Sequence, residues 1–181
     1  MPNILNGASV ELAKSYVLMT DLAEAQERAC ANIDRCQSNP SWSGPASRLE
    51  YENLDWQDGS VGSFGAKAGA RIWDLVVLSD CTYNVDVFPL LVTTLSAIHA
   101  QNCNLVEAGF QDSSKFATKV LMSTKPRHDS ERALFERLAA QGWVHHLESS
   151  IPMLKMNEED EAVEIYSITK CGPASKADAS A

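Results

Sequence analysis

The residues best suited to chemistry in this sequence follow a short apolar run. Leu75 to Ser79 is rich in Val and Leu without polar alternation, which predicts a parallel strand covered on both faces. Asp80, Tyr83 and Asn84 come directly after it. Ligands of open α/β sheets sit just beyond the carboxyl ends of the strands. A carboxylate and a phenol at this place are candidates for substrate chemistry. The alternative for Asp80 is the N-cap of the helix that follows.

An earlier segment has the same order of strand and carboxylate. Tyr16 to Thr20 predicts a short buried strand, and Asp21 follows it. The apolar spacing predicts a helix from Leu22 to Gln37. Asp21 is suited to be the N-cap of this helix, with Glu24 completing a capping box.

The remaining segments predict a sheet with intervening helices. Arg48 to Leu54 alternates and predicts a strand, which ends at Asp55 and Trp56. Further strands are expected over 116–123, 143–147 and 162–169, and helices over 85–101 and 129–141, with Gly142 as a C-cap. This order indicates an α/β sheet, mostly parallel, with an antiparallel edge hairpin. We expect a single domain over residues 1–170 and a disordered tail over 171–181.

Composition argues against several kinds of binding partner and cellular location. The net charge of −9 over 181 residues argues against general nucleic-acid binding. No segment approaches the roughly 18 apolar residues of a membrane span, and no signal peptide is recognisable. The five cysteines are scattered without a CxxC pair, so neither a disulfide framework nor a metal site is expected. A cytoplasmic location is expected, with the nucleus as an alternative.

Taken in order, these residues resemble a known family. The motifs are Thr20-Asp21-Leu22, Leu54-Asp55-Trp56, Asp80-Cys-Thr-Tyr83-Asn84, Lys125-x-Arg127, Phe135 and Val163-Glu-Ile-Tyr166. The order is similar to that of the seven-β-strand, S-adenosylmethionine-dependent protein-lysine methyltransferases. The branch is the one that methylates translation elongation factors and chaperones, often labelled nicotinamide N-methyltransferase-like. Its most specific mark is Asp-x-x-Tyr after the fourth strand, and the resemblance spans roughly residues 15–170.

The resemblance implies a fold and roles for the site residues. The fold would be a Rossmann-like methyltransferase sheet with helices on both faces and a C-terminal antiparallel hairpin. Asp21 would accept hydrogen bonds from the ribose hydroxyls of S-adenosylmethionine, beside Leu22. The residues beside the adenine would be Asp55 and Trp56.

On the substrate side, Asp80 and Tyr83 would orient the target amine as the catalytic pair, and Asn84 would bind substrate. Lys125 and Arg127 are expected to be solvated loop residues. No metal is required. The implied reaction is methyl transfer to a lysine of a protein such as a translation factor or chaperone. The enzyme is expected to be a monomer, with no nucleic-acid or membrane partner.

One family feature is absent from the sequence. The family has Gly-x-Gly-x-Gly after its first strand, where a Cβ would block the approach of the backbone to the cofactor. No such motif precedes Asp21. The sequence therefore predicts an N-terminally truncated sheet, in which the first strand is missing beside the strands that end at Asp21 and Asp80. A truncated or degenerate non-catalytic homologue and a small-molecule N-methyltransferase are the alternatives.

Overall fold

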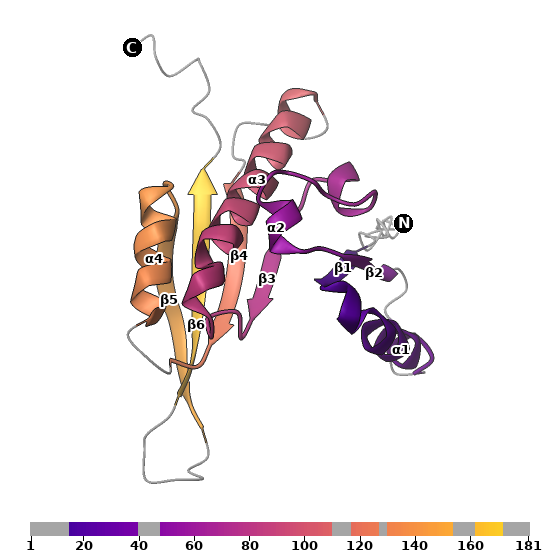
Figure 1. Ribbon diagram of the computed structural model, residues 1–181, viewed down its shortest axis with the longest axis horizontal. Helices are drawn as coiled ribbons and strands as arrows, with labels where there is room; N and C mark the ends of the chain where they lie inside the picture. The colour runs from indigo at the N-terminus through magenta and orange to yellow at the C-terminus, as the bar shows by residue number, and fades with distance from the viewer. Residues whose placement is uncertain (1–14, 40–47, 110–116, 127–129, 154–161, 172–181) are drawn as a thin grey trace, which may run out of the picture. The chain divides into compact units, whose positions relative to one another are not determined.

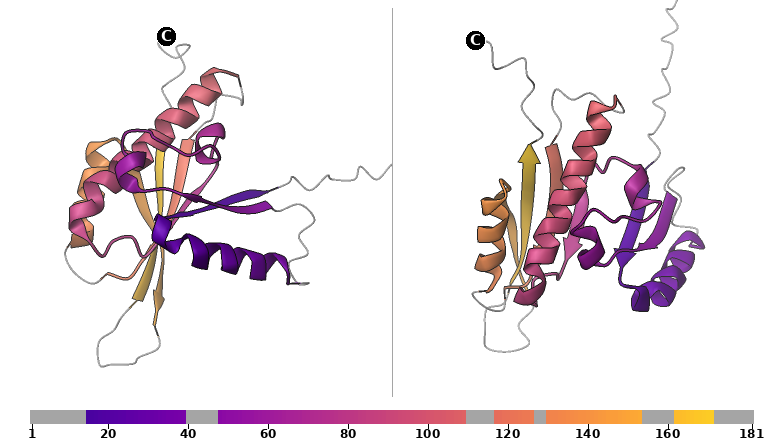
Figure 2. Two further views of the ribbon diagram at one scale, coloured as in Figure 1. Left: turned by 45° about the vertical axis from the view of Figure 1, so that its right-hand side comes forward. Right: turned by 45° about the horizontal axis from the view of Figure 1, so that its top comes forward.

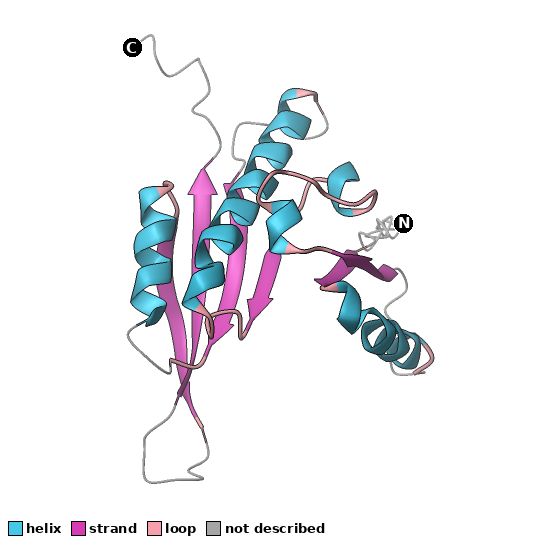
Figure 3. Cartoon of the chain, viewed as in Figure 1, coloured by secondary structure: helices cyan, strands magenta, loops and turns pink. Residues whose placement is uncertain are grey.

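The computed structural model describes residues 15–39, 48–109, 117–126, 130–153 and 162–171. The chain divides into two compact units, Met1–Leu54 and Asp55–Ala181, and each is considered by itself. Both units combine strands with helices, as Figures 1 and 3 show. The expected α/β class is confirmed.

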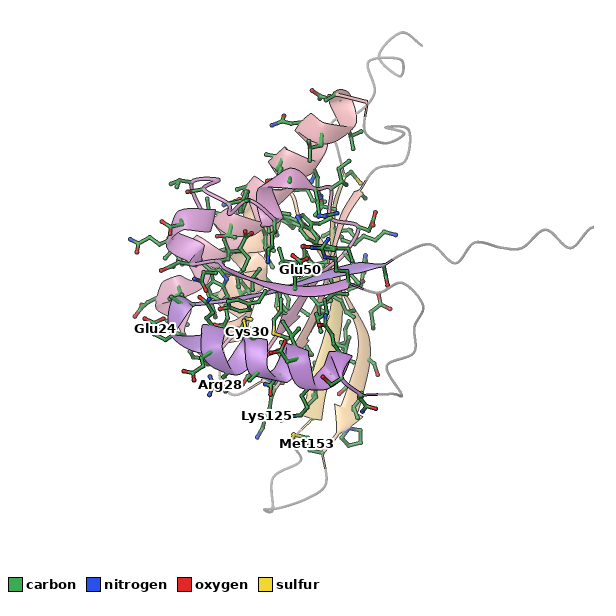
Figure 4. All side chains as sticks on the ribbon, turned by 90° about the vertical axis from the view of Figure 1, so that its right-hand side faces the viewer. Glu24, Arg28, Cys30, Glu50, Lys125 and Met153 are labelled. Carbon is green, nitrogen blue, oxygen red and sulfur yellow. The ribbon has the colours of Figure 1, made fainter. Side chains whose placement is uncertain are left out.

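The first unit is a parallel strand pair with a helix in its connection. β1 (Tyr16–Asp21) pairs with β2 (Arg48–Asn53) in a register that sets Asp21 opposite Asn53. Parallel neighbours need a long crossover, and α1 (Gln26–Gln37) lies in it. A small core joins the helix to the strands. It consists of Ala29, Ile33, Leu49 and Tyr51, with Cys30 (labelled in Figure 4) packed against them.

The helix of this unit begins later than the sequence predicted. A 3-10 turn, η1 (Ala23–Ala25), precedes α1. Leu22 is the N-cap of η1 and Ala25 is the N-cap of α1, and neither makes a side-chain cap hydrogen bond. Asp21 is still paired in β1, and its Oδ1 accepts a hydrogen bond from the Leu22 amide at 2.8 Å. The Asp21 side chain is thus one residue too early to reach the amides of the first helical turn. The prediction that Asp21 is the N-cap, with Glu24 in a capping box, is wrong.

The second unit contains a four-stranded mixed sheet in the order β3-β4-β6-β5. β3 (Val76–Ser79) is parallel to β4 (Ala117–Thr124). β6 (Ala162–Cys171) is antiparallel both to β4 and to β5 (Val144–Pro152). The C-terminal antiparallel hairpin predicted from the sequence is therefore present as β5 and β6.

The two long helices of this unit lie on one face of its sheet. A 3-10 turn, η3 (Val85–Val87), leads into α3 (Phe88–Glu107), which is followed along the chain by α4 (Ser130–Ala140). Figures 1 and 2 agree that α3 and α4 cover the same side. The core beneath them is the largest in the described part of the chain. It consists of Phe88, Leu91, Val92, Leu95, Val120, Met122, Leu134, Leu138, Trp143 and Ile168.

Side chains of α3 hold the segment that leads into β3. This segment contains α2 (Trp56–Gly59) and η2 (Ala68–Ala70). Asn102 is fully buried, and its Oδ1 accepts from the Trp73 amide at 3.0 Å while its Nδ2 donates to the Trp73 oxygen at 3.1 Å. Both backbone groups of Trp73 are thereby satisfied, which fixes the chain three residues before β3.

Each sheet has an open edge within the described residues. β1 pairs with β2, β3 pairs with β4, and no described strand pairs with the second edge of β1 or of β3. The sequence predicted a missing strand beside these two. A strand edge of this kind presents unpaired backbone N–H and C=O groups. In the same described ranges, no helix is long and apolar enough to cross a membrane.

Candidate active site

The carboxyl end of β3 turns sharply at Asp80. Its φ of 51° lies in the left-handed region, which among residues with a side chain is tolerated best by Asn and Asp. The Asp80 amide donates to the Ser123 backbone oxygen at 3.1 Å, so the residue stays attached to β4 while the chain leaves the sheet. Its side chain is solvent-exposed. The predicted catalytic carboxylate therefore lies in solvent at the carboxyl end of β3 and not inside the core.

The helix that follows is capped by Asn84. Its Oδ1 accepts a hydrogen bond from the Asp86 amide at 3.0 Å, which makes Asn84 the N-cap of η3. The alternative that Asp80 caps this helix is therefore wrong. Asn84 was expected to bind substrate, and that role stays a prediction beside its observed capping role.

Two neighbouring side chains after β3, those of Tyr83 and Thr82, differ strongly in their exposure to solvent. Tyr83 is 71% exposed, whereas Thr82 is only 3% exposed. Thr82 Oγ1 shares a hydrogen bond with Thr124 Oγ1 at 2.5 Å, and Thr124 is itself buried. The segment from Asp80 to Asn84 is called the Asp80–Asn84 turn below. It presents a carboxylate and a phenol to solvent and is anchored through a buried threonine.

The residues predicted to bind a cofactor ribose lie in the other unit. Asp21 ends β1, and its backbone oxygen accepts from the Leu54 amide at 2.9 Å. Its carboxylate is exposed and accepts one described hydrogen bond, from Leu22. An ionised carboxylate has about four acceptor sites, so acceptor capacity remains for the hydroxyls of a ribose. In this respect Asp21 fits the group that the resemblance implies.

A buried phenol supports the backbone beside Asp21. Tyr51 Oη donates to the Leu22 backbone oxygen at 2.9 Å. Burial raises the pKa of the Tyr51 phenol above its ordinary value of 10.0, and the negative charge of Asp21 raises it further. The phenol therefore stays protonated and remains a donor at every physiological pH. Leu22 itself is 48% exposed.

The two residues predicted to lie beside an adenine have structural contacts. Asp55 is the N-cap of α2, and its Oδ1 accepts from the Gln57 amide at 2.8 Å. Trp56 packs against the main core, and its backbone oxygen accepts from Thr94 Oγ1 at 3.0 Å. Contact with adenine stays a prediction for both. For the methionine end of the cofactor, the sequence before Asp21 offers no Gly-x-Gly-x-Gly.

Three of the predicted site residues come together in one turn: Asp80, Tyr83 and Asn84. In the same unit, Asp55 is the N-cap of α2 and Trp56 is its first residue, whereas Asp21 and Leu22 belong to Met1–Leu54. Lys125 (labelled in Figure 4) directly follows β4, as expected of a loop residue. Arg127 lies outside the described residues.

Several polar residues at this edge of the sheet were not predicted as site residues. Thr82 and Thr124 form the buried pair described above. Tyr166 Oη donates to Glu164 Oε2 at 2.6 Å, and the register places Glu164 opposite Thr124. A threonine at the end of β4 was the only sequence signal for the pair, because its partner is 42 positions away. Within the described residues, no group of three His, Cys, Asp or Glu side chains is arranged to hold a metal.

A comparison with known protein families shows the family of this chain. A family model described as "Lysine methyltransferase" matches residues 5–141, which is more than half of the 181-residue chain. The matched stretch includes Asp21, Asp55 and the whole Asp80–Asn84 turn. It also includes β4 and α4. No curated protein matches the chain.

Proposed function

Since the chain belongs to the lysine methyltransferase family, we propose that it transfers a methyl group from S-adenosylmethionine to a lysine side chain of a protein. A translation factor or a chaperone is the proposed class of substrate. The family implies a methyl donor of this type. The observation that carries the proposal is the Asp80–Asn84 turn, in which a carboxylate and a phenol face solvent from the carboxyl end of β3.

The chemistry needs a neutral amine held in one direction. A lysine side chain has a pKa near 10.4 and is almost fully protonated at neutral pH, so it must release a proton to solvent before its lone pair can react. The Asp80 carboxylate can accept hydrogen bonds from the amine, and the exposed Tyr83 phenol can do the same from a second side. Fixing the lone pair in this way lowers the entropic part of the barrier.

The donor would be held by residues of the earlier strands. Asp21 would accept hydrogen bonds from the ribose, with Leu22 beside it, and Asp55 and Trp56 would lie against the adenine. When bound, the donor supplies an electrophilic methyl group on a sulfonium. The exposed carboxylate of Asp21, with acceptor sites remaining, supports its part of this assignment.

The experiment that tests the proposal uses the 181-residue protein with methyl-labelled S-adenosylmethionine and a cell extract. Label on lysine residues of extract proteins, lost in Asp80→Asn, would support protein-lysine transfer. Label only on added nicotinamide-like amines would favour the small-molecule alternative. Thr118→Val, a change at the other end of β4, serves as the control for nonspecific loss.

A second candidate function is favoured by a specific observation. The sequence contains no Gly-x-Gly-x-Gly before Asp21, although the family uses this loop to approach the cofactor. A non-catalytic homologue would keep the strands and helices and would at most bind a partner protein. The labelling experiment separates the two, because a non-catalytic chain would transfer no label to any acceptor.

A further inference from the structure

Thr82 is the buried member of the Asp80–Asn84 turn. We propose that Thr82 is a positioning residue of the site: its hydrogen bond to Thr124 holds the turn on β4, so that Asp80 and Tyr83 keep one orientation toward the substrate amine. This inference rests on the proposed function. It concerns a residue that touches neither substrate nor cofactor and acts through its neighbours.

The first argument is the conformation of Asp80. A non-glycine residue at φ 51° occupies a sparsely populated backbone region, and such residues persist only where the surroundings fix them. The Asp80 amide is fixed by the Ser123 oxygen at 3.1 Å. This hydrogen bond attaches the first residue of the turn to β4.

The second argument is the place of the threonine pair. Thr82 lies two residues after Asp80, and Thr124 follows Ser123 on β4. The Oγ1–Oγ1 hydrogen bond of 2.5 Å is therefore a second attachment between the same two segments. Two attachments on one rigid strand fix the direction of the turn as well as its position. Tyr83, adjacent to Thr82 and 71% exposed, takes its direction from this anchor.

The third argument is burial. Thr82 and Thr124 are 3% and 2% exposed, so water does not replace the hydrogen bond if one hydroxyl is removed. A buried hydroxyl left without its partner is costly, whereas replacing both partners by apolar groups of the same shape can be nearly neutral for stability. Valine has the shape of threonine without the hydroxyl. The double replacement therefore removes the anchor while leaving the packing.

The test compares the wild type with Thr82→Val, Thr124→Val, the double variant and Thr82→Ser. Each protein is measured by thermal melting, by hydrogen exchange of the Asp80 amide, and by methyl-label transfer to extract proteins. We expect the double variant to melt near the wild type, yet to exchange the Asp80 amide about tenfold faster and to transfer label about tenfold more slowly. Thr82→Ser keeps the hydroxyl, so its rates of Asp80 amide exchange and of label transfer should stay near those of the wild type.

Thr118→Val is the matched control. Thr118 is a buried threonine at the other end of β4, in contact with His99. Its replacement should lower the melting temperature and leave Asp80 exchange and label transfer near wild type. This pattern separates loss of stability from loss of positioning.

Wild-type exchange at Asp80 in the double variant would overturn the inference, and so would wild-type transfer by a double variant that exchanges faster. If the wild-type protein transfers no label, the proposed function fails instead. The exchange measurement then still decides whether Thr82 holds the turn, because it needs neither donor nor substrate.

Discussion

Tyr51 and Leu22 are joined across the first unit by a hydrogen bond of 2.9 Å from the phenol to the backbone oxygen. The bond ties the middle of β2 to the residue after Asp21. The Leu22 oxygen also accepts from the Ala25 amide at 3.0 Å. Tyr51 is 9% exposed, so its phenol is a second donor that water replaces poorly.

This relationship predicts the effect of Tyr51→Phe. The ring and its packing remain and only the hydroxyl is lost, so the free energy of unfolding should fall by about 1 kcal/mol. Urea unfolding, monitored by far-UV circular dichroism, measures the change. Tyr16→Phe is the matched control, because the Tyr16 phenol bonds the partly buried Glu50 side chain within the same strand pair. An equal loss of unfolding free energy in both variants would show that the hydrogen bond to Leu22 contributes no more than the one to Glu50.

The S-adenosylmethionine affinity of the 181-residue protein is expected to be weak. The sequence has no glycine triplet before Asp21, and any Cβ in such a loop keeps the backbone away from the cofactor. Equilibrium dialysis with labelled S-adenosylmethionine should give a dissociation constant above about 100 μM, about 5.5 kcal/mol of binding free energy. Low-micromolar binding would show that other residues hold the methionine end.

Replacement of Asp21 should weaken whatever cofactor binding is measured. Asp21→Asn keeps the size of the side chain and removes the charged acceptor, which should raise the dissociation constant roughly 10- to 100-fold. The same dialysis measures it, with Asp34→Asn on the exposed side of α1 as the control. Since Asp21 does not cap the helix, thermal stability should barely change. A stability loss without a change in affinity would contradict the assignment to the ribose.

Asp80 needs a substitution that respects its backbone. Asp80→Asn tolerates the left-handed conformation and should reduce kcat about 100-fold with little effect on cofactor affinity, because contacts to the amine act mainly in the transition state. Asp80→Ala adds backbone strain of about 1 kcal/mol, so its melting temperature should be lower. Tyr83→Phe should show a milder loss of kcat. Wild-type turnover in Asp80→Asn would remove Asp80 from the catalytic pair.

The buried His99 predicts how stability depends on pH. Burial lowers the pKa of His99 below its ordinary value of 6.5, and the positive charge of Lys170 lowers it further. The unfolded chain therefore binds a proton at a higher pH than the folded chain does. The contribution of His99 to the free energy of unfolding is present above about pH 6.5. It is lost as the pH falls toward the pKa that His99 has in the folded protein.

The measurement for this prediction is urea unfolding at a series of pH values between about 5 and 8. His99 Nδ1 contacts Thr118 Oγ1 at 2.9 Å, and Cys103 Sγ lies 3.5 Å from Nε2. His99→Gln retains a polar side chain and does not titrate, so its stability should change less over the acidic range. Parallel pH profiles for the two proteins would exclude His99 as the source.

The sequence predicted the elements better than their junctions. The strand expected over 75–79 is observed as Val76–Ser79, but the prediction that both of its faces are covered is wrong, because Val77 is 64% exposed. The lysine methyltransferase resemblance is confirmed by the family match. The sequence predicted Asp21 as the N-cap of the first helix because a capping pattern is recognised from residue types and spacing alone. The structure shows Asp21 still in the ladder of β1, and whether a residue is paired depends on a partner strand 32 positions away.

The Thr82–Thr124 pair illustrates a second limit of local patterns. Threonine is common at strand ends, and nothing within a few residues of Thr82 indicates a partner. The pair forms because β3 and β4 are in a register that sets Ser79 opposite Ser123. Residue chemistry therefore selects Asp80 and Tyr83 as candidate site residues, whereas the proposed anchor, Thr82, is found only from the pairing of β3 with β4.

The open edge of β3 has a consequence for handling the protein at high concentration. Val77 is 64% exposed beside Leu121, and no described strand occupies the adjacent row of backbone donors and acceptors. An apolar edge of this kind is a template for pairing between molecules. Aggregation seen by light scattering should therefore rise with protein concentration, and Val77→Lys should suppress it. Solubility, more than the folding of either unit, would then set the concentration at which the protein can be studied.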